Sequence, residues 1–222
     1  MIGVIAAMRA EARSARPLKR NGCCIVTAGM GARCAREAAR RLLDNGADRL
    51  LAWGSAGALV GGLGSGTLLL PREVLDRDGK RFAVTADWHD RLWQKVPHGV
   101  AVNGEPIVTV SRPVSGCGAK AALHDSSGAV AVDMETAAIA ALAAEYEIAF
   151  AAVRAIVDPL ELELPPVVLK ARSERFAALE VPLRLLGRPR DLGALARLSR
   201  AMHAATRSLA TYARALAETA AD

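Results

Sequence analysis

Two apolar runs that stop abruptly at acidic residues constrain the fold of this chain most. Residues 129–132 lead directly into Asp133 and Glu135, and residues 149–157 lead into Asp158. Glu135 and Asp158 are 23 residues apart with an Ala-rich helical stretch between them, which is the length of one strand–helix–strand unit. We therefore expect both carboxylates at the same edge of a parallel sheet, where α/β enzymes bind their ligands.

The rest of the chain alternates between apolar runs of β type and helical periodicity. Strands are expected at 2–7, 23–28, 49–53, 67–74, 107–111, 129–132 and 149–156. Helices are expected at 32–44, 134–146 and about 192–218. This alternation predicts an α/β fold, in which residues 1–222 form a single domain with a mixed, largely parallel twisted sheet flanked by helices. A Leu-, Pro- and Arg-rich segment at 160–190 precedes the closing helix, and residues 81–105 show no readable pattern.

The charge balance brings an anionic partner into consideration. The formal net charge is +6 and the isoelectric point is about 9.5. The basic residues are not concentrated in one run with interleaved aromatic residues, so nucleic acid is not an expected partner. Arg200, Arg207 and Arg214 form a stripe at heptad spacing on the closing helix. This stripe fits either a solvated helix face or a contact with an anionic membrane surface.

Several other classes of protein find no support. Cys23, Cys24, Cys34 and Cys117 form no Cys-x-x-Cys motif, which favours free thiols in a reducing cytoplasm. The uncharged segment 50–71 contains six glycines and would make a poor membrane helix. The four histidines form no cluster, so we expect neither a metal ion nor an organic cofactor.

Two glycine motifs mark places where a ligand could approach the backbone. The motif Gly54-Ser55-Ala56-Gly57 follows a strand and offers N–H groups and a hydroxyl to an anion or a sugar, although a plain tight turn has the same sequence. The segment 29–31 opens a helix, as in a dinucleotide-binding fingerprint. Because the third glycine and the acidic residue at the required distance are missing, a dinucleotide cofactor is not expected.

Three carboxylates follow apolar strands, namely Glu11, Glu135 and Asp158. Any one of them fits an ordinary surface position after a strand, but three in one topology indicate a site. Cleavage of a glycosidic bond needs an acid for the leaving group and a base for water. It also needs an acceptor for sugar hydroxyls beside a cationic transition state. The three carboxylates match these needs.

Taken together, the motifs resemble the nucleoside phosphorylase superfamily, and within it the methylthioadenosine/S-adenosylhomocysteine nucleosidases. The matching pieces occur in family order at 2–11, 29–31, 54–57, 132–135 and 154–158. The resemblance implies a nucleoside phosphorylase-like three-layer αβα fold. It also implies cleavage of the N-glycosidic bond of an adenosine-type nucleoside, with water or phosphate as the second reactant.

The resemblance also implies a role for each matching residue. Glu11 corresponds to the water-activating base, and Asp158 to the acid that protonates N7 of the purine. Met134 and Glu135 correspond to the ribose-binding pair, in which Glu135 accepts the 2′- and 3′-hydroxyls. Ser55 corresponds to a residue near the nucleophile. Further substrate contacts are expected from Met8, Gly54 and Val114.

The chain departs from the family pattern at three places. Val157 stands where the family often has Ser before the catalytic Asp, so desolvation would tune the protonation of the acid instead. Residues 111–114 replace the segment that usually places a Phe against the purine. Ala52 stands where phosphorylases often carry Arg, which favours water as the nucleophile, although Arg9 and Arg33 could bind phosphate.

These departures are similar to the hopanoid-associated phosphorylases, a group associated with the removal of adenine from adenosylhopane. The similar pieces are 112–114, 157–159, 164–166 and the basic closing helix. The apolar residues of 160–189 would then line a channel for a triterpenoid tail, or pack in a homodimer interface. We expect a cytoplasmic enzyme that touches the inner membrane face. The alternatives are a methylthioadenosine/S-adenosylhomocysteine nucleosidase and a non-catalytic nucleoside- or lipid-binding protein.

Overall fold

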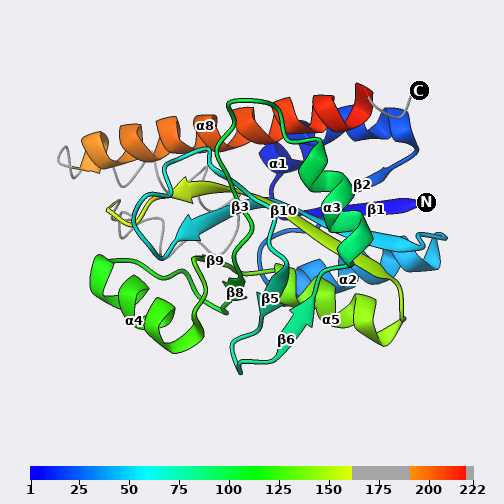
Figure 1. Ribbon diagram of the computed structural model, residues 1–222, viewed down its shortest axis with the longest axis horizontal. Helices are drawn as coiled ribbons and strands as arrows, with labels where there is room; N and C mark the ends of the chain where they lie inside the picture. Colours follow the sequence, from blue (N-terminus) through cyan, green and yellow to red (C-terminus); the bar gives the residue numbers. More distant parts are fainter. Residues whose placement is uncertain (162–190, 219–222) are drawn as a thin grey trace.

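A computed structural model describes residues 1–161 and 191–218 of the chain (Figure 1). The strands are β1 (Ile2–Ala6), β2 (Cys24–Thr27), β3 (Arg49–Ala58), β4 (Leu68–Leu69), β5 (Glu73–Leu75), β6 (Arg81–Ala83), β7 (Val102–Asn103), β8 (Ile107–Thr109), β9 (Ala131–Asp133) and β10 (Ala149–Asp158). The helices are α1 (Arg9–Ser14), the short 3-10 helix η1 (Arg16–Asn21), α2 (Ala32–Asp44), α3 (Ala86–Gln94), α4 (Cys117–Ser127), α5 (Thr136–Glu145) and α8 (Asp191–Glu218).

One mixed sheet joins the ten strands of the described part of the chain. Eight of them follow the order β6-β5-β8-β9-β3-β10-β4-β7, and β1 and β2 extend the sheet from the first half of β3. Six neighbouring pairs are parallel, and the pairs β3–β9, β4–β10 and β5–β6 are antiparallel. The expected mixed, largely parallel sheet is therefore confirmed.

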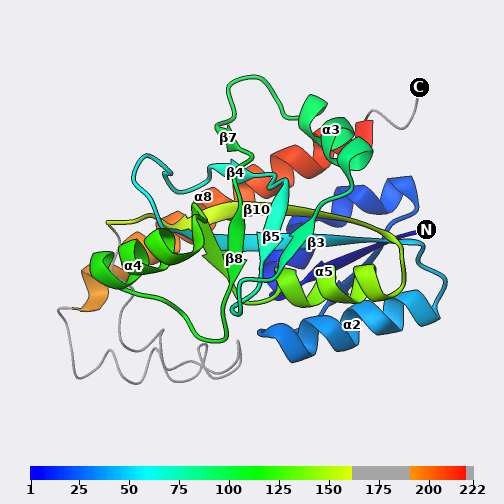
Figure 2. The same cartoon turned by 60° about the horizontal axis from the view of Figure 1, so that its bottom comes forward.

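Helices cover both faces of this sheet, which confirms the expected three-layer arrangement. The helices α2 and α5 contact each other on one face, whereas α1, η1 and α8 contact one another on the other (Figures 1 and 2). In α2 the buried residues are small or apolar and recur at helical spacing: Ala35, Ala38, Ala39 and Leu42. On the opposite face, Tyr212 of α8 stacks on Trp53 of β3 with ring centroids 6.2 Å apart, and both side chains are fully buried.

The central strands β3 and β10 set the position of the site. Their parallel register runs from the pair of Ala149 and Arg49 to the pair of Asp158 and Gly57. The register shifts between Ile156 and Asp158, so that one extra residue of β10 bulges out of the ladder. A β-bulge changes the direction in which the following side chain points, and here that side chain is Asp158.

Some local expectations were wrong. The strand expected at 67–74 is interrupted between β4 and β5, where Pro71 has no N–H to donate to a sheet. The segment from β9 to β10 was expected to be a parallel strand–helix–strand unit, and this was wrong. In the sheet β3 lies between the two strands; β10 is parallel to β3 and β9 is antiparallel to it, so β9 and β10 run in opposite directions. The helices α1, α3 and α4 were not foreseen.

Two expectations of a simpler kind were met. Among the described residues the four cysteines are free thiols. The uncharged segment 50–71 contains all of β3 except Arg49, then a Gly-rich turn and β4, as expected from its glycines. The strand expected to end at residue 53 continues to Ala58, so the motif 54–57 lies inside β3 and does not follow it. Across residues 1–161 and 191–218, none of the helices combines the length and the apolar character needed to cross a membrane.

Candidate active site

Glu11 lies in the first turn of α1, directly after β1, and its carboxylate is held by three hydrogen bonds. Its Oε1 accepts from the backbone N–H of Ser55 at 2.9 Å and from the Ser55 hydroxyl at 2.7 Å, and its Oε2 accepts from the N–H of Met8 at 2.9 Å. The residue is 2% exposed. Burial raises the pKa of Glu11, while the nearby Arg154 guanidinium and the hydrogen bonds from Ser55 and Met8 oppose that rise.

The backbone of β3 comes close to this carboxylate because residue 54 has no side chain. A Cβ atom at Gly54 would lie 3.0 Å from Glu11 Oε1 and would collide with the guanidinium of Arg154. The motif 54–57 was expected to let a ligand approach the backbone closely. In the structure, Gly54 lets the charged side chains of Glu11 and Arg154 approach the backbone closely.

Arg154 is the centre of a buried polar network that also joins β9 and α5. Its Nη2 lies 2.7 Å from Asp133 Oδ2, and its Nε donates to the Thr136 hydroxyl at 3.0 Å. Asp133 in turn accepts from the hydroxyl of Thr109 at 2.6 Å and from the backbone N–H of Thr136 at 3.0 Å. Because every partner is buried, this network holds the guanidinium in one place beside Glu11.

Glu135 stands between β9 and α5, at the N-terminal end of the helix. Its Oε1 accepts a 2.6 Å hydrogen bond from the N–H of Gly31, which precedes α2. Burial, followed by the negative charge of Asp133, raises the pKa of Glu135 to about 7. The negative charge of Glu11 makes a smaller contribution to this rise, and Arg154 and the Gly31 N–H oppose it, so Glu135 belongs to the same electrostatic cluster as Glu11.

Asp158 ends β10 directly after the bulge and is 4% exposed. Its Oδ2 lies 3.0 Å from the Nζ of Lys120, which is fully buried. Within the described residues, its Oδ1 is buried and has no hydrogen-bond partner. Burial raises the pKa of Asp158, and the Lys120 ammonium works against that rise. A buried carboxyl with one occupied and one unpaired oxygen is suited to exchange a proton or a hydrogen bond with a ligand.

The structure brings most of the expected residues together around β3. Glu11, Ser55 and Gly54 contact one another, Met8 donates to Glu11, and Glu135 feels the charge of Glu11. Asp158 contacts the same strand at residue 57, where a Cβ atom would lie 3.3 Å from its Oδ2. The segment 54–57 therefore touches both the Glu11 cluster and Asp158.

The other expected residues differ in their exposure and in their surroundings. Arg33 is 86% exposed in its side chain and forms an ion pair with Glu37 one turn along α2. Arg9 is exposed at the start of α1. Val114 is partly buried against a small apolar cluster with Leu59 and Val132, and Met134 is partly buried just before Glu135. The segment 162–190, in which an apolar channel or a dimer interface was expected, lies outside the described residues.

Sequence reasoning missed Arg154, Asp133 and Lys120 as members of the site. Arg154 and Asp133 stand inside the quoted motifs, each close to a predicted site residue, and a charged residue inside an apolar strand was the available signal. Lys120 offered no such signal, because a lysine in an otherwise polar, Ala-rich helix normally faces solvent.

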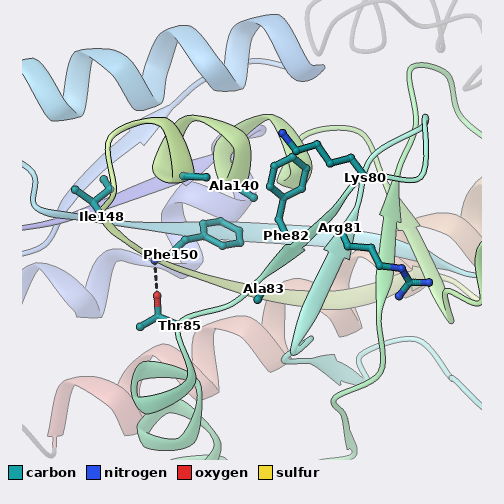
Figure 3. A pocket seen from close by; sticks show the side chains of 9 residues that line it. Lys80, Arg81, Phe82, Ala83, Thr85, Ala140, Ile148 and Phe150 are labelled. Atoms are coloured by element: carbon teal, nitrogen blue, oxygen red, sulfur yellow. Dashed lines mark hydrogen bonds between the residues drawn. The ribbon is translucent and has the colours of Figure 1, made fainter.

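The structure also contains a surface hollow that is separate from this cluster. It has a volume of about 300 Å³ and is lined by side chains in and next to β6, α5 and the start of β10, including Lys80, Phe82 and Phe150 (Figure 3). It shares no residue with the Glu11, Glu135 and Asp158 cluster. Among the described residues, no three His, Cys, Asp or Glu side chains are grouped so that they could hold a metal ion.

Comparisons with known proteins agree with this picture of the fold. A family model described as "Phosphorylase superfamily" matches residues 6–181, which is more than half of the chain. No curated protein matches the sequence. A solved 5′-methylthioadenosine/S-adenosylhomocysteine nucleosidase from Neisseria meningitidis, in complex with methylthio-immucillin-A, superposes with a TM-score of 0.75. It is 20% identical, over 98% of both chains.

Two solved structures from Helicobacter pylori give similar values. A futalosine hydrolase mutant has a TM-score of 0.73 at 14% identity, over 98% of both chains. A 5′-methylthioadenosine/S-adenosylhomocysteine nucleosidase complexed with a substituted pyrrolidin-3-ol has a TM-score of 0.72 at 16% identity, over 98% of this chain and 97% of that one. At these identities the likeness establishes the fold.

Proposed function

Since the chain belongs to the phosphorylase superfamily, whose members cleave the N-glycosidic bond of nucleosides, we propose that its substrate is an adenosine-type nucleoside with a 5′ substituent. Adenine is the product that leaves. The observation that supports this most is the buried set of Glu11, Arg154 and Glu135 beside Ser55 of β3. Asp158 ends the neighbouring strand β10, and its Oδ1 has no hydrogen-bond partner among the described residues.

Each carboxyl group has a distinct part in this reaction. Asp158 donates a proton to N7 of the purine, so that the base leaves as a neutral molecule. Glu135 accepts hydrogen bonds from the 2′- and 3′-hydroxyls of the ribose, and its negative charge stabilises the cationic sugar in the transition state. Glu11 takes a proton from the attacking water, and its three hydrogen bonds keep it oriented for that step. Met134 and Met8 are the adjacent substrate contacts.

Water is the nucleophile that the charges of the site favour. Phosphate needs uncommitted positive charge, but Arg154 is already paired with Asp133 and is surrounded by Glu11 and Glu135. Arg33, a candidate phosphate ligand, is largely exposed and paired with Glu37. Arg9 is exposed as well. A phosphate ion beside the carboxylates of Glu11, Glu135 and Asp133 would be repelled by their negative charge.

The experiment that tests the function follows free adenine after incubation with several nucleosides. Methylthioadenosine, S-adenosylhomocysteine and adenosylhopane are compared, each with and without phosphate. We expect adenine release that does not require phosphate. Ribose 1-phosphate chemistry that appears only with phosphate would overturn the hydrolytic assignment, and no adenine from any adenine nucleoside would favour a non-catalytic nucleoside- or lipid-binding protein.

For the 5′ substituent, we propose the triterpenoid of adenosylhopane, with a methylthioadenosine-type substrate as the alternative. The alternative is supported by the solved relatives, two of which are nucleosidases for methylthioadenosine and S-adenosylhomocysteine. The triterpenoid is supported by the sequence pieces described above and by the exposed basic side chains of α8. A lower apparent KM for nucleosides with a longer apolar 5′ group would support the triterpenoid, and equal use of methylthioadenosine would reject it.

We further propose that the protein is a cytoplasmic homodimer. The apolar composition of 160–189 supports this, because leucines and valines in that number normally pack against something. Light scattering coupled to size-exclusion chromatography measures the mass directly, and a monomer mass across a range of protein concentrations would reject the dimer.

A further inference from the structure

Lys120 occupies an unusual place for a lysine. It is the one fully buried residue of α4, all of whose residues are described. Its ammonium lies 3.0 Å from Asp158 Oδ2 and donates to the carbonyl oxygen of Pro159 at 2.9 Å. A helix normally packs through apolar side chains, but α4 turns a charged one towards the end of β10.

Fold stability gives a weak reason for this arrangement. Removing an ammonium from water is costly, and a buried ion pair is often no more stabilising than apolar residues of similar volume. The attachment of α4 to the chain after β10 also has a second contact, since the Cys117 thiol lies 3.4 Å from the carbonyl oxygen of Leu160. The ammonium of Lys120 therefore calls for an explanation in the chemistry of Asp158.

We propose that Lys120 is a positioning residue for Asp158, holding Oδ2 so that Oδ1, which has no hydrogen-bond partner among the described residues, faces the leaving base; this inference rests on the proposed function. The Pro159 carbonyl fixes the ammonium, and the ammonium in turn fixes the carboxyl plane. The bulge at Val157 turns Asp158 towards β3. In the family pattern a Ser often stands at position 157, and its hydroxyl could orient the acid; here the ammonium of Lys120 orients Asp158 instead.

The proton balance of this arrangement is simple. The proton on Asp158 Oδ1 moves to N7 of the purine while the glycosidic bond breaks and its electron pair goes to the base. Lys120 keeps its proton throughout, and Asp158 regains one from solvent after adenine leaves. Burial raises the pKa of Asp158, and the positive charge of Lys120 opposes that rise. Lys120 therefore makes Asp158 a stronger acid, so that Asp158 loses its proton at a lower pH than it would without Lys120.

The test compares pH profiles of adenine release for the wild type, Lys120→Met, Lys120→Arg and the control Lys95→Met. Lys95 is an exposed cation after α3, so its loss changes the net charge equally without touching Asp158. The alkaline limb of the kcat profile is the pH range in which activity falls because Asp158 loses its proton. Lys120→Met should reduce kcat by roughly 10-fold or more, and should move this limb to higher pH by about one pH unit or more, because the positive charge that lowers the pKa of Asp158 is lost. Lys120→Arg should keep the limb near its wild-type position, and Lys95→Met should change neither value.

An alkaline limb that stays in place in Lys120→Met would overturn the proposal, because a residue that only packs α4 would lower activity without moving it. A measurement on the wild type covers the case in which Lys120→Met does not fold. The carboxyl carbon of Asp158, assigned by its loss in Asp158→Asn, is titrated by NMR and compared with the alkaline limb of kcat. Disagreement between the two would also overturn the proposal.

The two hypotheses can fail separately. If wild-type protein releases no adenine from any nucleoside, the proposed function fails, while the NMR titration of Asp158 in the wild type and in Lys120→Met still measures their coupling. A carboxyl pKa that is the same with and without Lys120 would reject the coupling on its own.

Discussion

Glu135 is the side chain whose protonation most directly limits binding of a ribose. Its pKa is raised to about 7, and only the ionised carboxylate can accept hydrogen bonds from both sugar hydroxyls with both oxygens. The apparent KM should therefore rise as the pH falls below about 7. Glu135→Gln should have a higher KM at every pH and should lose this dependence. Initial rates between pH 5 and pH 9 check the prediction, and a KM that is constant in the wild type would contradict it.

The same carboxyl should make the stability of the fold depend on pH. Because the folded pKa of Glu135 lies above its ordinary value of 4.5, the folded state holds a proton that the unfolded state has released between about pH 4.5 and 7. Stability is therefore lost as the pH rises through this window. Glu135→Gln should raise Tm, and by more at pH 8 than at pH 5. Thermal unfolding at the two pH values measures this, and an equal change at both would reject it.

Asp158 should be the acid on which turnover depends. Asp158→Asn keeps the shape but removes the donated proton, so kcat should fall by at least ~100-fold. The matched control is Asp125→Asn, which changes an exposed aspartate of α4 and should leave kcat unchanged. Near-normal turnover in Asp158→Asn would show that the acid lies elsewhere.

At the scale of elements, the site requires that β3 carry no side chain at residue 54. A methyl group at Gly54 would collide with Arg154 and press on Glu11. Gly54→Ala should cost roughly 1–3 kcal/mol of stability and lower kcat/KM by ~100-fold, because a small displacement of a catalytic group is costly. Gly61→Ala is the control, since no atom of the described residues lies within 4 Å of a Cβ there. Similar effects of the two substitutions on kcat/KM would contradict the prediction.

At the scale of the whole molecule, one helical layer of the described structure carries a marked excess of positive charge. The segments 9–21 and 191–218, which contain α1, η1 and α8, carry nine basic and three acidic residues, a balance equal to the whole formal charge of +6. These helices contact one another on one face of the sheet (Figure 1). The exposed basic side chains include Arg200, Arg207 and Arg214, as expected for a stripe on the solvent side of α8.

This layer should bind anionic vesicles in a salt-dependent way. Each arginine near an anionic surface contributes roughly 1 kcal/mol, so changing Arg200, Arg207 and Arg214 to Gln should weaken binding by ~10-fold or more. The control changes Arg77, Arg91 and Lys95, which alters the net charge equally on other elements. Co-sedimentation with neutral and anionic vesicles, at low and high salt, measures the effect. Equal loss in both triple variants, or no binding to anionic vesicles, would reject the idea.

Local patterns in the sequence determined a good part of this protein. Alternating apolar runs and helical periodicity predicted the α/β class and the long helix α2, since these depend on which side chains neighbouring residues must bury. The acidic residues at strand ends predicted Glu11, Glu135 and Asp158 as a set. The resemblance supplied their proposed roles, and the family model that matches residues 6–181 confirmed the superfamily.

The tertiary structure decided which groups meet. Gly31 and Glu135 are 104 residues apart in sequence, yet the backbone nitrogen of Gly31 lies 2.6 Å from Glu135 Oε1. No periodic pattern in the sequence encodes that pairing. The antiparallel course of β9 was hidden in the same way, because strand direction depends on how distant segments dock. The burial of Lys120 against Asp158 is the clearest case. A lysine in a polar helix is normally solvated, and only the packing of α4 on the end of β10 turns it into the partner of a buried acid.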